Sequence, residues 1–239
     1  MGAFFSDWGP TFAHGVEITL IVTVLGSVLA LVVAFILGFL ARARPVLPRF
    51  VARVIIEFFR GTSLFVQLFW LFYVLPLFGY QLNPIAVGVV ATGLNYGAYA
   101  AEVVRGAINA IPKPQFEATV ALNMTPYQRM RRVILPQAFV GMIPPLGNLL
   151  IQALKGSALV SLITLTDITT AAQRYRESGG STFVAFGFAL LIYFVIAYGF
   201  TLGLNAVEHR AKAGVGMVEP RRALFAARKP PPVQGSELA

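Results

Sequence analysis

The chain of 239 residues is strongly apolar: 57% of its residues are hydrophobic, and its 19 Lys and Arg with its 10 Asp and Glu make up only 12%. A soluble domain carries about 25% charged residues, so this composition excludes an ordinary soluble protein, and the high hydrophobicity excludes disorder. The net charge of +9 comes from Lys and Arg placed between apolar stretches rather than on one folded face, which argues against a nucleic-acid partner. We therefore expect a polytopic membrane protein.

Apolar stretches long enough to cross a bilayer as helices occur five times along the chain. The run 29–39 is apolar on all sides and does not alternate, which favours helices over membrane-spanning strands. The sequence therefore predicts an all-α membrane protein with five transmembrane helices. The expected spans are 15–40, 54–78, 84–110, 137–165 and 183–207.

Lys and Arg are distributed unevenly between the connecting segments. Fourteen follow the first, third and fifth spans, whereas the fourth is followed by Arg174 and Arg176 only. Because cytoplasmic loops are enriched in these residues, the N-terminus is expected outside and the C-terminus in the cytoplasm. We divide the chain into an extracytoplasmic N-terminus (1–14), a transmembrane domain (15–210) and a disordered, basic cytoplasmic tail (211–239).

The polar segment 111–136, between the third and fourth spans, is predicted to form an elbow of two short helices. Pro114 suits the first turn of one helix, and Asn123 suits a left-handed cap at its end. Thr125 and Gln128 have the spacing of a capping box that begins the second helix. The pattern alone leaves open whether this elbow docks a partner or rests on lipid headgroups.

Polar residues inside three expected spans recur at helical spacing and therefore share faces. Such residues are costly in a bilayer, about 2.5–3.5 kcal/mol for a charge at a helix centre, so they face protein or water. They could line a passage for a zwitterionic solute, whose carboxylate Lys155 would meet. The candidate passage residues are Gln67 in the second span, Asn95, Tyr99 and Glu102 in the third, and Asn148, Gln152 and Lys155 in the fourth.

Two pairs of opposite charge, Glu57 with Arg60 and Glu102 with Arg105, stand three residues apart near the expected cytoplasmic ends of their spans. Side chains at this spacing are neighbours on a helix, so we expect a structural role in which each pair neutralises itself. Lys155 has three possible environments: the passage, an interface between subunits, or a buried pair with Glu102.

Several function classes lack the residues that they need. There is no cysteine, and His14 and His209 lie outside the expected spans, so we expect no metal site, no cofactor and no intramembrane enzyme. Lys-Gly-Ser at 155–157 is the reverse of a phosphate-binding loop, so the chain is not expected to bind ATP. An ion-coupled secondary carrier remains the alternative, although an odd span count without an internal repeat argues against it.

Several stretches resemble the permeases of ATP-binding-cassette (ABC) importers. Residues 117–119, Asn123 and 133–136 match the loop pattern E-A-A, three residues, G, nine residues, I, one residue, L-P with its spacing kept. Residues 59–68 and 98–106 resemble the polar-amino-acid branch of that family. The resemblance covers about residues 15–210.

This sequence departs from the family pattern at several positions. Thr119, Asn123 and Val133 stand for Ala, Gly and Ile in the loop, Pro114 stands where Gly is usual, and 155–158 lacks the usual Lys-acid-Thr-Ser order. The residues at 60–63 (Arg-Gly-Thr-Ser) and 121–126 (Ala-Leu-Asn-Met-Thr-Pro) most resemble those of permeases for ectoine and hydroxyectoine.

The resemblance implies a bacterial inner-membrane permease subunit that performs no bond chemistry itself. Its implied partners are a dimer of cytoplasmic ATPases, a second and distinct permease, and an extracytoplasmic solute-binding protein. It also implies roles for elbow residues. Glu117 would make a polar contact with the ATPase, Ala118 and Ala121 would allow close approach, and Asn123 would form the turn.

Overall fold

The computed structural model describes residues 2–214, so the expected tail lies outside the described residues from position 215 onward. These residues form helices and no strand, which confirms an all-α fold. Short segments continue some helices: η1 (Trp70–Val74) and η2 (Leu75–Phe78) follow α3, η3 (Met130–Ile134) joins α6 to α7, and η4 (Ser157–Ile163) follows α7. The helices are α1 (Gly2–Leu40), α2 (Val46–Gly61), α3 (Leu64–Phe69), α4 (Pro84–Asn109), α5 (Lys113–Ala121), α6 (Pro126–Arg129), α7 (Leu135–Gly156), α8 (Ile168–Glu177) and α9 (Thr182–Gly214).

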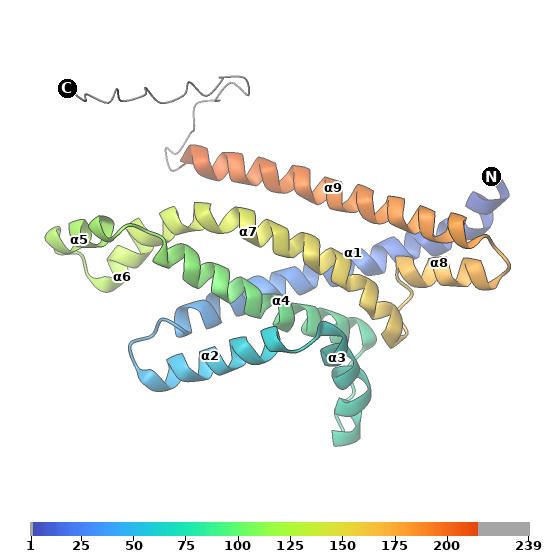
Figure 1. The fold of residues 1–239 in the computed structure, drawn as a ribbon, viewed down its shortest axis with the longest axis horizontal. Coiled ribbons are helices and arrows are strands. Elements are labelled where there is room, and N and C mark those ends of the chain that lie inside the picture. Colours follow the sequence, from blue (N-terminus) through green and yellow to red (C-terminus); the bar gives the residue numbers. More distant parts are fainter. Residues whose placement is uncertain (1, 215–239) are drawn as a thin grey trace, which may run out of the picture.

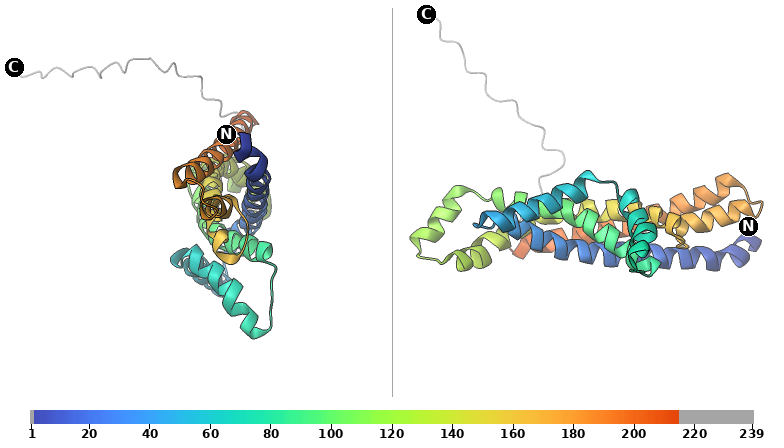
Figure 2. Two further views of the ribbon diagram at one scale, coloured as in Figure 1. Left: turned by 90° about the vertical axis from the view of Figure 1, so that its right-hand side faces the viewer. Right: turned by 90° about the horizontal axis from the view of Figure 1, so that it is seen from below.

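Four long helices, α1, α4, α7 and α9, form an elongated bundle (Figures 1 and 2). α2 packs on α1 and α4, and α8 packs on α1 and α9 at the end of the bundle where the N-terminus lies. α5 and α6 project at the opposite end, toward which the last turns of α9 also run. The bundle therefore has one end that carries α8 and another that carries the α5–α6 elbow.

Glycines let α1 and α4 approach closely in the middle of the bundle. A Cβ atom at Gly93 would lie 2.5 Å from Leu29 Cδ2, and one at Gly97 would lie 2.8 Å from Val33 Cβ. Cβ atoms essentially never show contacts this short, so a larger residue at either position would force Leu29 or Val33 of α1 to shift. In a membrane, where lipid is as apolar as the helix surface, such close packing is a main source of helix association.

The prediction of a single continuous helix over 54–78 is wrong. α2 ends at Gly61, and the segment Leu64–Phe78 leaves it at an angle of 100°. Thr62 and Ser63 have extended backbones, with ψ of 148° and 136°, and they break the helix between the two. Hydropathy averages composition over a window and carries no information about direction, so a continuous apolar run conceals this bend.

Fewer helices meet the length and apolarity that membrane crossing requires than the five expected. Among the described residues, three do so: Trp8–Leu40, Pro126–Ile163 and Thr182–Ala213; the bent pair of Val46–Gly61 and Leu64–Phe78 would be a fourth. α4 nearly coincides with the expected span 84–110 but is not among them. Small and polar residues that serve close packing lower its hydropathy.

The first and last helices are longer than expected. α1 is helical well before residue 15, and within that extension Phe12 packs edge-on against Phe188 of α9, with ring centroids 5.0 Å apart. α9 continues beyond residue 207 to Gly214, and an ion pair between Glu208 and Lys212 (2.7 Å), one turn apart, supports the added turns.

Candidate translocation pathway and coupling elbow

The predicted turn at Asn123 is confirmed. Asn123 has φ of +53°, in the left-handed region. Its N–H donates to the Val120 carbonyl (2.9 Å), and the Met124 N–H donates to the Thr119 carbonyl (3.1 Å), so α5 ends in a Schellman motif. The Asn for Gly replacement therefore preserves the turn, because Asn tolerates this backbone conformation better than most residues.

The predicted capping box is also confirmed. The Gln128 N–H donates to Thr125 Oγ1 (3.3 Å), and the Thr125 N–H donates to Gln128 Oε1 (3.0 Å), with Pro126 at the first helical position. The helix that begins here runs through η3 into α7. The second helix of the elbow, α6, is therefore continuous with α7 in one helical segment, Pro126–Ile163, whereas α5 precedes it across the turn at Asn123.

Apolar side chains fasten the elbow to the bundle. Phe116 of α5 and Met130 and Val133 of η3 pack on a buried cluster that includes Ile108 of α4 and Ile134. Thr119 is 2% exposed, and its hydroxyl donates to the Phe116 carbonyl (2.7 Å), which satisfies the polar group that replaces the family's Ala. The elbow is thus packed on the α4–α7 core.

The outer surface of the elbow exposes apolar side chains beside charged ones. Glu117, Ala118 and Ala121 are all exposed, as the role inferred for them requires. Val120 and Leu122 beside them are 54% and 70% exposed, which is unusual for large apolar side chains at a polar end of a molecule. Exposed apolar residues around one carboxylate form a surface suited to a protein partner.

Three of the candidate passage residues meet at the α2–α3 bend. Gln67 Nε2 and Asn95 Nδ2 each donate to the Phe59 carbonyl, both at 3.1 Å. Gln67 Nε2 also donates to Thr62 Oγ1 (2.6 Å), and the Tyr99 hydroxyl donates to the Arg60 carbonyl (3.1 Å). These side chains cap the end of α2 from α3 and α4.

The capping has a clear physical reason. The last carbonyls of a helix have no partner within it, and inside a membrane water is not there to replace one. Gln67 and Asn95 are 8% and 5% exposed, so their bonds to Phe59 are shielded from solvent. The structure therefore gives these two amides a structural part at the bend. Gln67 Oε1 has no hydrogen-bond partner and lies among residues that line an apolar groove of about 290 Å³.

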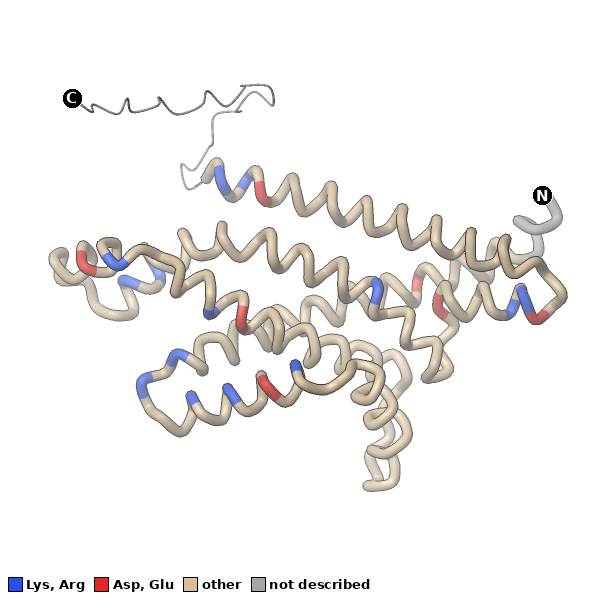
Figure 3. Tube along the Cα trace, viewed as in Figure 1, with Lys and Arg blue, Asp and Glu red and all other residues tan. Residues whose placement is uncertain are grey.

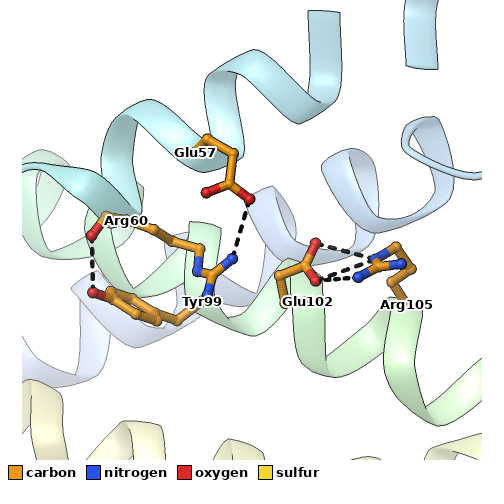
Figure 4. A network of polar contacts seen from close by, with 5 residues as sticks. All are labelled: Glu57, Arg60, Tyr99, Glu102 and Arg105. Carbon is orange, nitrogen blue, oxygen red and sulfur yellow. Dashed lines mark hydrogen bonds and ion pairs between the residues drawn. The ribbon is translucent and has the colours of Figure 1, made fainter. Parts of the chain in front are cut away.

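Both predicted ion pairs are present (Figure 4). Arg60 Nη1 lies 3.4 Å from Glu57 Oε1, and Arg105 Nε lies 3.1 Å from Glu102 Oε1. The Arg60 guanidinium also lies 5.5 Å from the centre of the Tyr99 ring. Since Glu102 is bound to Arg105, the structure does not show a pair between Glu102 and Lys155.

The polar face of α7 remains open. Asn148, Gln152 and Lys155 are all exposed on that helix. Lys155 lines a groove of about 420 Å³ between α7 and α9 together with Tyr193. No hydrogen bond or ion pair occupies the Lys155 ammonium within the described residues, so it is available to a ligand or to another subunit.

Among the described buried polar residues that the sequence patterns did not indicate, Asp167 is the charged one. Asp167 is fully buried and caps α8, where it accepts bonds from the Thr170 N–H (2.9 Å) and hydroxyl (2.8 Å) and from the Tyr193 hydroxyl (3.3 Å). An Asp just before a helix is a recognisable capping signal, but its burial under α9 is a long-range feature. Within the described residues, no three His, Cys, Asp or Glu side chains gather closely enough to hold a metal ion.

A comparison with protein families identifies the chain. Residues 26–212 match the family described as "binding-protein-dependent transport system inner membrane component". The chain belongs to this family. It is therefore an inner-membrane permease, a component of a transport system rather than an enzyme.

Two curated relatives of the permease are matched over most of their length. The L-cystine transport system permease protein TcyB of Bacillus subtilis is 37% identical, over 86% of this chain and 88% of that protein. The glutamine transport system permease protein GlnP of Escherichia coli K12 is 32% identical, over 86% and 98%. Among solved structures, an amino acid ABC transporter with histidines matches with a TM-score of 0.80 and 33% identity, over 86% of this chain and 96% of that one.

Proposed function

We propose that this permease forms, with a second permease, the translocation path of an ABC importer for a polar amino acid or a related zwitterion. The names of TcyB, GlnP and the solved amino acid transporter support this substrate class. None of these names mentions ectoine or hydroxyectoine. Those two zwitterions are specific candidates within the class because of the resemblance at 60–63 and 121–126. Family membership disfavours an ion-coupled secondary carrier.

The exposed elbow surface carries the proposal of coupling. Glu117, Ala118 and Ala121 face outward, while Phe116 behind them is packed on the α4–α7 core. A partner that seats on this surface and moves would displace the elbow as a rigid unit. Phe116 of α5 packs in the same cluster as the start of the segment that becomes α7, so closure of an ATPase dimer would shift the helix that carries Asn148, Gln152 and Lys155.

The path of the chain supports five membrane passes with the N-terminus outside. α1, α2, α4, α7 and α9 alternate in direction along the bundle, with α2 ending partway along it at the bend to α3 (Figure 1). Lys and Arg gather at the end that carries the elbow (Figure 3). By the positive-inside rule, this end faces the cytoplasm, where an ATPase is found, and the α8 end faces the binding protein outside.

The proposal predicts that Glu117→Lys releases the ATPase. The tagged full chain would be isolated in mild detergent from native membranes, and co-purifying proteins would be identified by mass spectrometry. Wild type is expected to co-purify with an ATPase. Glu117→Lys is expected to lose at least nine-tenths of that ATPase, because a positive charge at position 117 would be repelled by the group on the ATPase that attracts the carboxylate. The distinct second permease is expected with both.

Glu177→Lys is the matched control, since Glu177 is also an exposed carboxylate and lies on α8, at the other end of the bundle. It should retain the ATPase. Recovery of the chain alone, or equal ATPase recovery from both variants, would refute the coupling role of the elbow. Peptides from only one permease sequence would refute the heterodimer.

A second prediction concerns Lys155. Lys155→Met is expected to slow substrate uptake roughly ten- to a hundredfold, since a hydrogen bond to a charged group contributes about 1.5–3 kcal/mol. Subunit recovery in the same pull-down should not change, because the side chain has no partner within the described residues. Uptake of radiolabelled amino acids and ectoine into proteoliposomes measures the effect. Lys155→Arg, which keeps the charge, is the control, and wild-type uptake by Lys155→Met would remove Lys155 from the mechanism.

A further inference from the structure

Four arginines from three separate segments surround one cavity near the elbow end of the bundle. One comes from the turn after α1, two from α2 and one from α4. The cavity measures about 240 Å³. Its lining residues are Ala41, Arg42, Arg49, Arg53, Arg105 and Asn109.

The arginines of the cavity are only partly neutralised. Arg42 is hydrogen-bonded to the Asn109 side-chain oxygen, and Arg105 is bound to Glu102. Arg49 and Arg53 make no hydrogen bond or ion pair within the described residues. Four positive charges therefore face the cavity, and the nearby carboxylates are those of Glu102, paired with Arg105, and Glu57, paired with Arg60.

The like charges are close enough to influence each other. Burial and the nearby charge of Arg105 lower the pKa of Arg42, a residue in the turn between α1 and α2. A lowered pKa means that the charged form is disfavoured where it stands. A bound anion would favour the charged form of Arg42, because it places an opposite charge beside the guanidinium.

The positive-inside rule does not account for the arrangement. That rule sets how many Lys and Arg lie on one side of a membrane, and it is equally satisfied by residues that point into solvent. Arg44 in the same turn and Arg132 at the elbow are exposed and do not line the cavity. The convergence of Arg49, Arg53 and Arg105 on one space is a separate feature.

The exposed surface of α2, the helix that supplies two of the arginines, indicates what kind of anion the cavity suits. α2 carries its basic residues together with exposed apolar ones, among them Leu47 (73% exposed), Phe50 (62%) and Val54 (51%). A free anion makes no use of this surface. An amphiphile does, because its headgroup can sit among the arginines while its acyl chains cover the apolar side of the same helix.

We propose that this cavity binds the phosphate headgroup of an anionic phospholipid, with the acyl chains along the exposed apolar side of α2. A guanidinium group can donate two parallel hydrogen bonds to two oxygens of one phosphate, which a lysine ammonium cannot do, so arginine is the better residue for this site. Basic pockets between transmembrane helices on the cytoplasmic side are known to hold such headgroups. The inference rests on the proposed cytoplasmic placement of the elbow end. A lipid bound there would tie α2 to the end of α1 and to α4.

The test measures lipid retention by the full chain, purified with its co-purifying subunits in mild detergent. Native mass spectrometry would compare added phosphatidylglycerol, phosphatidylethanolamine and inorganic phosphate. Wild type is expected to retain phosphatidylglycerol at least tenfold better than phosphatidylethanolamine. Arg49→Gln/Arg53→Gln should lower that retention at least tenfold, and Arg49→Lys/Arg53→Lys should lower it less.

Arg44→Gln/Arg132→Gln is the matched control because it removes the same charge from exposed positions outside the cavity. Retention within about twofold of wild type is expected for it. An equal loss in the two glutamine pairs would show a diffuse charge effect and overturn the site. Binding of inorganic phosphate as strong as that of phosphatidylglycerol would identify a free-anion site instead. Neither readout involves the ATPase, so failure here is distinct from failure of the coupling proposal.

Discussion

Replacing Gln67 and Asn95 together with leucine is expected to destabilise the permease by more than the sum of the two single substitutions. Each amide donates to the Phe59 carbonyl at the end of α2. Either single variant leaves that carbonyl with one partner, whereas the double variant leaves it with none. A buried polar group without a partner costs about 1–3 kcal/mol, and the bilayer offers no water in compensation.

Denaturant unfolding in detergent micelles, followed for wild type, both single variants and the double variant, gives this excess as a coupling free energy. The control cycle pairs Asn95→Leu with Tyr99→Phe. The Tyr99 hydroxyl bonds to a different carbonyl, that of Arg60, so these two changes should be additive. Additivity in both cycles would mean that the Phe59 carbonyl is not the shared element at the bend.

Substitution of Asn123 by valine is expected to abolish coupling, whereas substitution by glycine preserves it. Asn123 has φ of +53°, where a β-branched side chain clashes with the backbone and glycine meets no penalty. The cost to valine is about 1–2 kcal/mol for the residue. Asn123 forms the turn that sets the angle between α5 and α6. A strained turn there would change that angle and displace the surface around Glu117.

The measurement is recovery of the ATPase with the tagged permease, combined with uptake into proteoliposomes. We expect Asn123→Val to lose most of both and Asn123→Gly to match wild type. Asn123→Ala, which lacks the β-branch, should fall between them. A valine variant that couples normally would show that the left-handed turn is dispensable and that the elbow surface tolerates a change of angle.

Local features of this protein could be read from neighbouring residues. The capping box depends on Thr125 and Gln128, three positions apart, and the α5 cap depends on Asn123 and carbonyls within four positions of it. The ion pairs Glu57–Arg60 and Glu102–Arg105 are equally local, and all of these interactions are found in the structure. Their partners stand within one helical turn, so residue type and spacing suffice to predict them.

The bend shows where such prediction ends. A polar residue in an apolar span signals that some partner must exist, but not which one. Asn95 bonds to a carbonyl 36 positions away, and Tyr99 to one 39 positions away. Both side chains were expected to line the passage. Their actual partners could not be predicted, because every residue has a backbone carbonyl and the sequence does not mark which one is free. The same holds for the arginine cavity, where Arg42, in the turn after α1, and Arg105, on α4, come together only in the fold.

Composition, periodicity and capping act over one turn or one span, so residue order alone predicts a helical membrane protein with the elbow. The angle of 100° between α2 and α3, the side chains that cap the bend, and the exposure of Lys155 beside the pairing of Glu102 were visible only in the fold. The physical reason is that these outcomes depend on which helices pack together. That choice follows from close approaches such as those of Gly93 and Gly97 to α1, which involve positions far apart in the chain.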